Sequence, residues 1–227
     1  MKKNVLITGA NRGIGLETAR QMKALGYEVI LTSRNADEGQ RVARDLGVGY
    51  HQLDVASAES ISALTAHMDA EFGQLDVLIN NAGILLDRHD KILDVPVEKM
   101  QTMFETNTLA PLMLIRALLP LMRKNDYGRI VNVSSQLGSI NNFSDYTPAY
   151  RLTKLALNGV TRMLADALKG TNILVNSVHP GWVKTEMGGA SAPLSLEDGA
   201  RNVIWAATLP DDGPQGGFYY DGKAMDW

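Results

Sequence analysis

The feature that most constrains this chain is a regular alternation between short apolar runs and longer segments with apolar residues at helical spacing. Runs rich in β-favouring residues occur at 5–7, 28–31, 77–79, 130–133 and 173–175. Between them lie stretches such as 150–168, where apolar residues recur three and four positions apart. Apolar strands of this kind are typical of a parallel sheet covered by helices on both faces. The sequence therefore predicts an α/β fold, with one doubly wound, Rossmann-type domain over residues 1–227.

Charge and composition narrow the function classes. The 227 residues carry a net charge of -3, with Lys and Arg scattered along the chain, which argues against a polyanionic nucleic-acid partner. The chain has no cysteine, and its histidines, at 51, 67, 89 and 179, are too dispersed to predict a metal site. The longest apolar stretch, 109–122, contains an arginine and two prolines, so we expect a core or interface helix rather than a membrane span. These features favour a cytoplasmic protein.

A glycine-rich turn joins the first predicted strand to the first predicted helix. It reads Thr8-Gly9-Ala10-Asn11-Arg12-Gly13-Ile14-Gly15. Such a turn lets the backbone approach a pyrophosphate, whose negative charge is favoured by the free N–H groups at a helix start. Glycines alone are a weak signal, and the alternative is an ordinary strand–helix turn. The position directly after the first strand favours dinucleotide binding.

The second predicted strand ends without a carboxylate. NAD-specific sites present an acidic residue to the ribose hydroxyls about 20 residues beyond the glycines, and this chain has Thr32-Ser33-Arg34 there. Arg34 and Arg12 could instead bind a ribose 2′-phosphate, because guanidinium presents forked donors that suit phosphate. The alternative is that both are solvated surface arginines. We predict NADP(H) in preference to NAD(H).

Tyr150 and Lys154 are one turn apart on the same face of the predicted helix at 150–168. A free tyrosine has a pKa of about 10, so it is a better proton donor to a developing alkoxide when a nearby cation favours the phenolate. Lys154 would be that cation. An amphipathic helix with a snorkelling lysine has the same spacing, so this pair alone does not decide the function.

Taken together, the motifs resemble the short-chain dehydrogenase/reductase family. The family's order and approximate spacing are matched by the glycine turn, Asn80-Asn81-Ala82-Gly83, Asn107, Ser134-Ser135 and the Tyr150 and Lys154 pair. The match covers nearly the whole chain, and within the family the segments 8–19 and 179–185 are most similar to the carbonyl reductases. The resemblance implies NADPH-dependent reduction of a small-molecule ketone or aldehyde.

The resemblance also implies a catalytic set of Asn107, Ser135, Tyr150 and Lys154. Tyr150 is then the general acid, while Lys154 binds the nicotinamide ribose and lowers the tyrosine pKa. Ser135, rather than its neighbour Ser134, hydrogen-bonds the substrate carbonyl. Asn107 holds a water beside the lysine, although an ordinary polar helix residue is the alternative.

Cofactor-binding residues follow from the same resemblance. Asp54 contacts the adenine, or is simply a turn aspartate; Asn80 forms part of the cofactor floor; and the segment after His179 closes over the nicotinamide. The full set is Gly9, Asn11, Arg12, Gly13, Ile14, Gly15, Ser33, Arg34, Asp54, Val55, Asn81, Ala82, Gly83, Tyr150, Lys154, Pro180, Gly181, Val183 and Thr185.

Two segments are expected to shape the substrate pocket. The interval from Ser135 to Tyr150 is longer than the commonest family spacing and contains a second tyrosine, Tyr146, with no lysine four residues on. The Gly-, Ser- and Pro-containing stretch at about 183–196 predicts a mobile substrate loop. An apolar or aromatic substrate is suggested by Leu85, Gln136, Tyr146, Trp182 and Met187, which could equally be core residues.

Three alternatives stay open at this point. The first is NAD-linked alcohol oxidation at the same site, the second a non-catalytic NADP-binding regulator on the same fold, and the third a different Rossmann enzyme such as a methyltransferase. The family often pairs the helices corresponding to 107–122 and 150–168 across a two-fold axis, so a homodimer or homotetramer is also possible.

Overall fold

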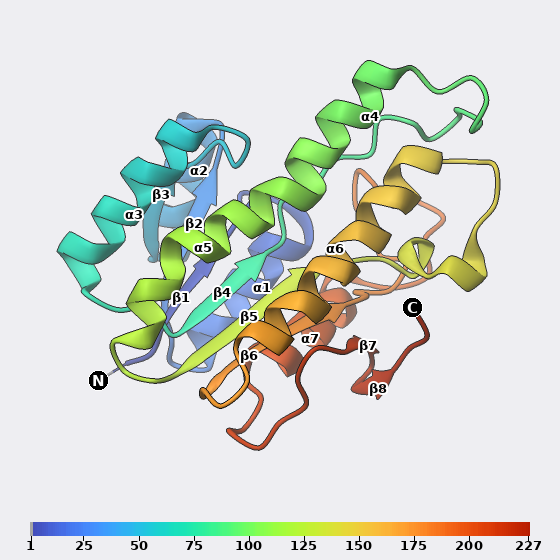
Figure 1. Ribbon diagram of the computed structural model, residues 1–227. Coiled ribbons are helices and arrows are strands. Elements are labelled where there is room, and N and C mark those ends of the chain that lie inside the picture. The colour runs from blue at the N-terminus through green and yellow to red at the C-terminus, as the bar shows by residue number, and fades with distance from the viewer. Residues whose placement is uncertain (1) are drawn as a thin grey trace.

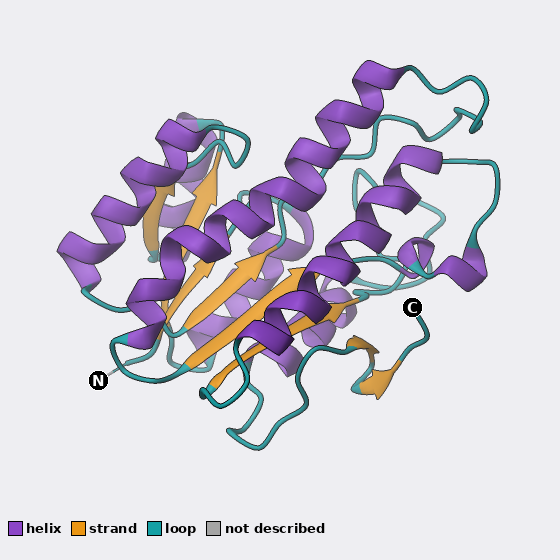
Figure 2. Cartoon of the chain, in the orientation of Figure 1, coloured by secondary structure: helices purple, strands orange, loops and turns teal. Residues whose placement is uncertain are grey.

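Strands and helices alternate as predicted in the computed structural model, which describes residues 2–227 (Figure 1; Figure 2). The elements are β1 (Asn4–Ile7), α1 (Gly13–Ala24), β2 (Glu28–Ser33), α2 (Ala36–Leu46), β3 (Gly49–Gln52), α3 (Ala58–Phe72), β4 (Val77–Asn80), α4 (Val97–Phe104), a π-helical turn (Glu105–Leu109), α5 (Ala110–Arg123), β5 (Gly128–Val133), 3-10 turns at Gln136–Gly138 and Ile140–Asn142, α6 (Pro148–Ala167), β6 (Ile173–Val178), α7 (Leu196–Ala207), β7 (Phe218–Tyr220) and β8 (Lys223–Ala224). Within residues 2–227, no helix combines the length and apolar character that crossing a bilayer requires.

The strands form one 8-stranded sheet in the order β3-β2-β1-β4-β5-β6-β7-β8. The first seven of these run parallel, which confirms the predicted doubly wound fold, whereas β8 pairs antiparallel with β7. The exception has a local cause: Asp221 and Gly222 both have positive φ, 50° and 68°, and such a pair forms the tight turn that joins antiparallel strands.

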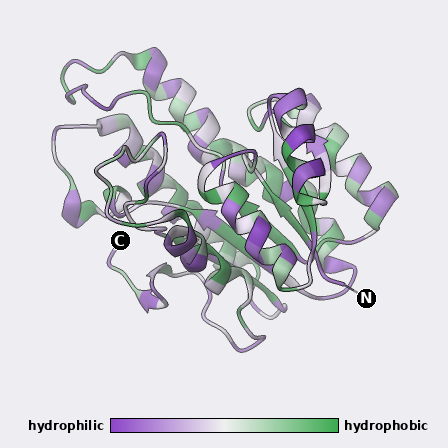
Figure 3. Cartoon of the chain, turned by 180° about the vertical axis from the view of Figure 1, so that it is seen from behind, coloured by the Kyte–Doolittle hydropathy of each residue, from purple (hydrophilic) through white to green (hydrophobic). Residues whose placement is uncertain are grey.

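Each face of the sheet has its own apolar core. Leu6 and Leu78 point toward α3, α5 and α6, while Val5 and Ile7 point toward α1 and α7. Successive strand residues face opposite sides, so a strand buried on both faces must be apolar throughout. Seen from behind, the apolar strands lie inside and the polar surfaces of the helices outside (Figure 3).

A π-helical turn interrupts the long helix formed by α4 and α5. At this turn, Ala110 N–H bonds to the carbonyl of Glu105, five residues back. Pro111 follows at the start of α5; because it has no N–H, it cannot donate to the carbonyl of Asn107. Such turns inside α-helices occur frequently at functional sites. Asn107 thus lies in a widened turn, not in an ordinary helix.

The strand order reverses between β1 and β4, each of which pairs with the other and then continues outward. In open α/β sheets, ligands bind at the carboxyl ends of the strands beside this reversal. The loops after β1, β4, β5 and β6 begin at this edge of the sheet, and they carry most of the predicted site residues.

Candidate active site

The turns after β1 and β4 are tied together by side-chain hydrogen bonds. Thr8 Oγ1 accepts from the N–H groups of Asn81 and Ala82, both at 3.0 Å. In return, Asn81 Nδ2 donates to the carbonyls of Thr8 at 2.9 Å and Gly9 at 3.1 Å. The glycine turn and the Asn81–Gly83 turn therefore form one rigid edge at the strand reversal.

The start of α1 has the shape and charge that an anion needs. Gly9 and Gly13 adopt positive φ of 62° and 59°, and a Cβ on Gly15 would lie 2.5 Å from Asn81 Nδ2 and 2.8 Å from the carbonyl of Gly9. Arg12, the N-cap residue, makes no side-chain cap, and the first turn contains no acidic residue. The first N–H groups and the positive end of the helix dipole are thus available to a pyrophosphate.

The two arginines predicted to bind a 2′-phosphate are both exposed. Arg34 is exposed at the end of β2, and Arg12 is exposed in the glycine turn, where it forms an ion pair with Glu186 of the loop after β6. Ser33 is different: it is buried, and its hydroxyl donates to the carbonyl of Asn35 at 2.8 Å. The Ser33 side chain therefore stabilises the turn that follows β2.

Of the cofactor contacts predicted after β3 and in β4, one side chain is exposed and two are buried. Asp54 Oδ1 accepts from Ala56 N–H at 3.0 Å, which is the turn role named as the alternative. The residue is nevertheless exposed, whereas Val55 is buried in the core beneath it. Asn80, expected as cofactor floor, is buried and donates from Nδ2 to Asn132 Oδ1 at 2.8 Å, so this side chain links β4 to β5.

The last residue of the Asn81–Gly83 turn lies next to the side chains of Asn107 and Lys154. Asn107 grips the backbone of Ile84 with two bonds, accepting at Oδ1 at 2.8 Å and donating from Nδ2 at 2.9 Å. A Cβ added to Gly83 would lie 3.3 Å from Asn107 Oδ1 and 3.6 Å from Lys154 Nζ. The missing side chain of Gly83 therefore leaves a small polar space between the amide and the ammonium.

Lys154 is almost fully buried on α6 and donates from Nζ to the carbonyl of Val133 at 2.8 Å. Burial lowers the pKa of Lys154 to about 8, because a charged ammonium loses hydration in the interior. Its Nζ lies 5.6 Å from the centre of the Tyr150 ring. The structure thus brings the predicted lysine and tyrosine together on one helix face.

Tyr150 is 8% exposed, and its hydroxyl lies under the loop after β6, 3.9 Å from Met187 Sδ. Burial raises the pKa of Tyr150 to about 12; the side chain of Ser135 opposes this shift, and the charge of Asp87 adds to it. The direction is opposite to the expected lowering by Lys154, because desolvation of the phenolate is the largest cause of the shift. At neutral pH the phenol is therefore protonated, as a proton donor must be.

The two serines after β5 have different surroundings. Ser134 is buried, and its hydroxyl approaches the carbonyl of Lys154 at 3.5 Å, whereas Ser135 is partly exposed and its side chain acts to lower the pKa of Tyr150. Ser135 Oγ also accepts from Leu137 N–H at 3.2 Å. Of the pair, Ser135 is the one placed beside the tyrosine hydroxyl.

The loop predicted at about 183–196 is pinned at both ends. Val183 and Leu194 form a parallel bridge, with Lys184 N–H donating to the carbonyl of Leu194 at 2.9 Å, and α7 begins immediately afterwards at Leu196. Inside the loop, Thr185 lies next to Gly13, and Arg88 donates to the carbonyl of Met187. The loop therefore covers both the glycine turn and Tyr150.

Pro180 and Gly181 lead into this loop from β6. Pro180 is buried, and its carbonyl accepts from Asn202 Nδ2 at 3.3 Å. Gly181 has a φ of 90°, and the Leu194 side chain occupies the space that a Cβ would need. A residue other than glycine at this position would push the loop away from the strand ends.

The long interval between Ser135 and Tyr150 forms two 3-10 turns and is fastened to the end of the chain. Ser139 Oγ and Ile140 N–H both donate to the carbonyl oxygen of Trp227, at 3.1 Å and 3.0 Å. Tyr146 is 49% exposed and packs against Lys91. Tyr146 is therefore not a second buried proton donor.

One residue at the site was missed by sequence reasoning. Asp87, fully buried in the loop after β4, accepts from Ala149 N–H at 2.7 Å and Tyr150 N–H at 3.2 Å. No local pattern identifies it, because its partners are 62 and 63 positions away.

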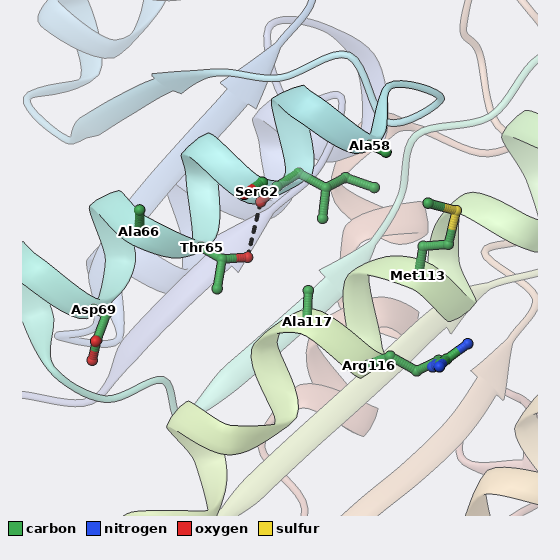
Figure 4. Close-up of a pocket in the computed structure, with 9 residues that line it drawn as sticks. Ala58, Ser62, Thr65, Ala66, Asp69, Met113, Arg116 and Ala117 are labelled. Atoms are coloured by element: carbon green, nitrogen blue, oxygen red, sulfur yellow. Dashed lines mark hydrogen bonds between the residues drawn. The ribbon is translucent and has the colours of Figure 1, made fainter.

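A groove away from these residues lies between α3 and α5 and is lined by Ala58, Ile61, Ser62, Thr65, Ala66, Asp69, Met113, Arg116 and Ala117 (Figure 4). It contains none of the residues described above. Across residues 2–227, no three His, Cys, Asp or Glu side chains gather as metal ligands.

Comparison with known proteins identifies extensive likenesses. A model of the short chain dehydrogenase family matches residues 3–193. Carbonyl reductase (NADPH) 1 of Mus musculus is 33% identical, covering 98% of this chain and 97% of that relative. The (+)-neomenthol dehydrogenase of Arabidopsis thaliana is 31% identical, covering 97% and 96%.

Solved structures agree over the same length. Carbonyl reductase Sniffer of D. melanogaster has a TM-score of 0.90 at 34% identity and covers 100% of both chains. An NADPH-bound carbonyl reductase from chicken fatty liver has a TM-score of 0.90 at 32% identity, covering 100% of this chain and 99% of that one.

Proposed function

Because the chain belongs to the short chain dehydrogenase family, we propose that it reduces a ketone or aldehyde with NADPH and that Tyr150 is the proton donor. One observation carries this proposal. The Tyr150 hydroxyl is buried at the strand reversal beside Ser135, with Lys154 Nζ 5.6 Å from the centre of its ring and the Gly83 turn next to that ammonium. Such a group suits neutralisation of an alkoxide as it forms.

The residues present fit NADPH. The uncapped start of α1 would hold the pyrophosphate, and Arg12 and Arg34 would bind the 2′-phosphate, which no carboxylate at the end of β2 would repel. The space beside Gly83 would receive the nicotinamide ribose, within reach of Lys154. When bound, NADPH supplies the hydride. Two similar proteins are named for, or solved with, NADPH, which supports the preference over NADH.

In the proposed reaction, the chain's own groups hold the substrate and move a proton. Ser135 and Tyr150 donate hydrogen bonds to the carbonyl oxygen, which orients the carbonyl carbon for hydride arrival. As negative charge develops on that oxygen, the Tyr150 O–H bond breaks and its proton neutralises the alkoxide. The charge of Lys154 stabilises the phenolate left behind, and the polar space between Asn107 and Lys154 provides a route for proton return.

The test is the initial rate of NADPH oxidation with a panel of ketones, aldehydes and quinones, repeated with NADH and with Tyr150→Phe. We expect turnover with NADPH, much less with NADH, and a loss of about 1,000-fold in kcat in Tyr150→Phe. Tyr127→Phe is the matched control, because that tyrosine lies just before β5, at the opposite edge of the sheet, and its substitution should leave kcat unchanged. NADPH binding without reduction of any carbonyl, and no effect of Tyr150→Phe, would support a non-catalytic regulator instead.

A further inference from the structure

The start of α6 lacks a cap of its own. Its N-cap residue, Thr147, has left-handed angles, φ 52° and ψ 46°, and makes no side-chain cap. The Thr147 hydroxyl instead donates to the carbonyl of Tyr146 at 2.7 Å. A helix start of this kind leaves backbone N–H groups that need acceptors from elsewhere.

Every N–H group in this first turn can be traced to its acceptor. Thr147 N–H donates to the carbonyl of Asp90 at 3.2 Å, Pro148 has no N–H, and Arg151 N–H donates to Thr147 at 3.1 Å. The remaining two, Ala149 and Tyr150, both donate to Asp87 Oδ2, at 2.7 Å and 3.2 Å. Asp87 thus caps the helix from another loop.

Capping by Asp87 has an energetic cost, because it buries a carboxylate. Its side chain is fully buried, and Oδ1 has no hydrogen-bond partner in the part of the chain that the structure describes. A serine or asparagine at the N-cap position would satisfy the same N–H groups without burying a charge. An unsatisfied buried polar atom of this kind calls for a reason beyond capping.

The reason lies in what the loop connects. Asp87 lies four residues beyond Gly83, in a segment that Asn107 grips at Ile84 with two hydrogen bonds. The segment Gly83–Asp87 is therefore held at one end by Asn107 and at the other by the backbone of Tyr150 itself. The carboxylate joins the turn that borders the proposed cofactor site directly to the residue that carries the proton.

We propose that Asp87 is a positioning residue: its buried carboxylate caps α6 from outside and fixes the Tyr150 hydroxyl relative to the Asn81–Gly83 turn. This inference rests on the proposed function, since it concerns the geometry of proton donation. Truncation of Asp87 releases the first turn of α6 without touching the glycine turn or the arginines. The proton-transfer step should therefore suffer while NADPH binding persists.

The test compares Asp87→Ala and Asp87→Asn with Asp90→Ala, a control in the same loop whose side chain pairs with Lys99 and whose capping carbonyl is unaffected. We expect Asp87→Ala to lower kcat by about 30-fold or more, since small misplacements of a catalytic group have large effects, with the Kd of NADPH within about twofold. Asparagine keeps an acceptor oxygen, so Asp87→Asn should restore kcat to within about fivefold. Asp90→Ala should match the parent.

A second readout does not depend on activity. Amide hydrogen exchange at Ala149 and Tyr150 should rise about 10-fold in Asp87→Ala and stay unchanged at 157–165 in the same helix. If Asp87→Ala does not fold, Asp87→Asn decides through a smaller rise, about two- to fivefold, at the same amides, because a neutral acceptor is weaker.

Parental kcat and parental exchange in the folded variants would overturn the proposal, as would an equal loss of kcat in Asp87→Asn and Asp87→Ala. A parent protein that reduces no carbonyl would overturn the proposed function, and the exchange measurement would still decide whether Asp87 holds the Tyr150 backbone.

Discussion

The helices α1 and α6 begin in opposite ways at the same edge of the sheet. Neither is capped by its own N-cap side chain, unlike α2, α3 and α7, which begin with caps from Asn35, Ser57 and Ser195. The start of α1 stays open, with no acidic residue in its first turn. The start of α6 is filled by Asp87 from a distant loop.

This difference shows how one structural rule serves two purposes. Any helix start attracts negative charge. At α1 the attraction is left for an anionic ligand, whereas at α6 the anion is part of the protein and fixes the residue that we propose donates the proton. Changes that fill the first start or remove features of the second therefore test the comparison directly.

The largest expected effect comes from filling the open start. Arg12→Asp places a carboxylate at the N-cap of α1, where it can accept from the first-turn N–H groups and repel phosphate. We expect the Kd of NADPH to rise about 1,000-fold, while the free energy of unfolding rises by about 1 kcal/mol. Isothermal titration calorimetry and urea unfolding measure the two changes.

Arg12→Gln is the control for this prediction, because it removes the guanidinium without adding an acceptor charge. It should weaken NADPH binding less and leave stability unchanged. Equal losses of affinity in both variants would mean that only the arginine matters, and not the open helix start.

Lowering the pH should reduce the stability of the fold through His179, a buried residue that follows β6 at the same edge of the sheet. Burial lowers the pKa of His179 to about 4, so between about pH 6.5 and 4 the unfolded chain binds a proton that the folded chain does not. The free energy of unfolding should therefore fall by up to about 3 kcal/mol as the pH drops through this window. His179→Gln should flatten the slope in urea unfolding, and His89→Gln, at an exposed position, should not.

The self-capped and externally capped helices should respond oppositely to loss of the N-cap side chain. Ser195 forms a capping box with Asp198 at the start of α7, so Ser195→Ala should cost about 1 kcal/mol. Thr147 contributes no cap and holds a left-handed φ of 52°. Glycine adopts this angle more readily, so Thr147→Gly should raise the free energy of unfolding by about 1 kcal/mol. Thermal unfolding compares them, and a loss of stability in Thr147→Gly would contradict the idea that Asp87 alone supplies the cap.

The smallest expected effect concerns the ion pair across the open start. Glu186 pairs with Arg12 on the exposed surface, so it competes with a bound phosphate for the guanidinium. Exposed pairs contribute little, and Glu186→Gln should tighten the Kd of NADPH by only about threefold. The Kd of NADH should not change, nor should Glu197→Gln, at an exposed position of α7, affect either cofactor. Equal tightening for both cofactors would exclude a 2′-phosphate effect.

Much of the fold followed from the sequence alone, because it depends on neighbours along the chain. The apolar runs predicted β1, β2, β4, β5 and β6, and helical spacing placed Tyr150 and Lys154 on one face of α6. The glycine turn was also readable, since the positive φ of Gly9 and Gly13 is a local requirement. The antiparallel β8 was not anticipated.

The tertiary structure decided which polar groups are engaged and which are free. It turned the Ser33 hydroxyl inward, gave Arg12 a carboxylate partner, and brought Asp87 to the backbone of Tyr150. It also reversed the expected direction of the Tyr150 pKa shift, because the buried phenol loses the hydration that would stabilise its phenolate. Periodicity and backbone angles are set within a few residues, whereas burial and hydrogen-bond partners depend on how loops far apart in the chain pack together.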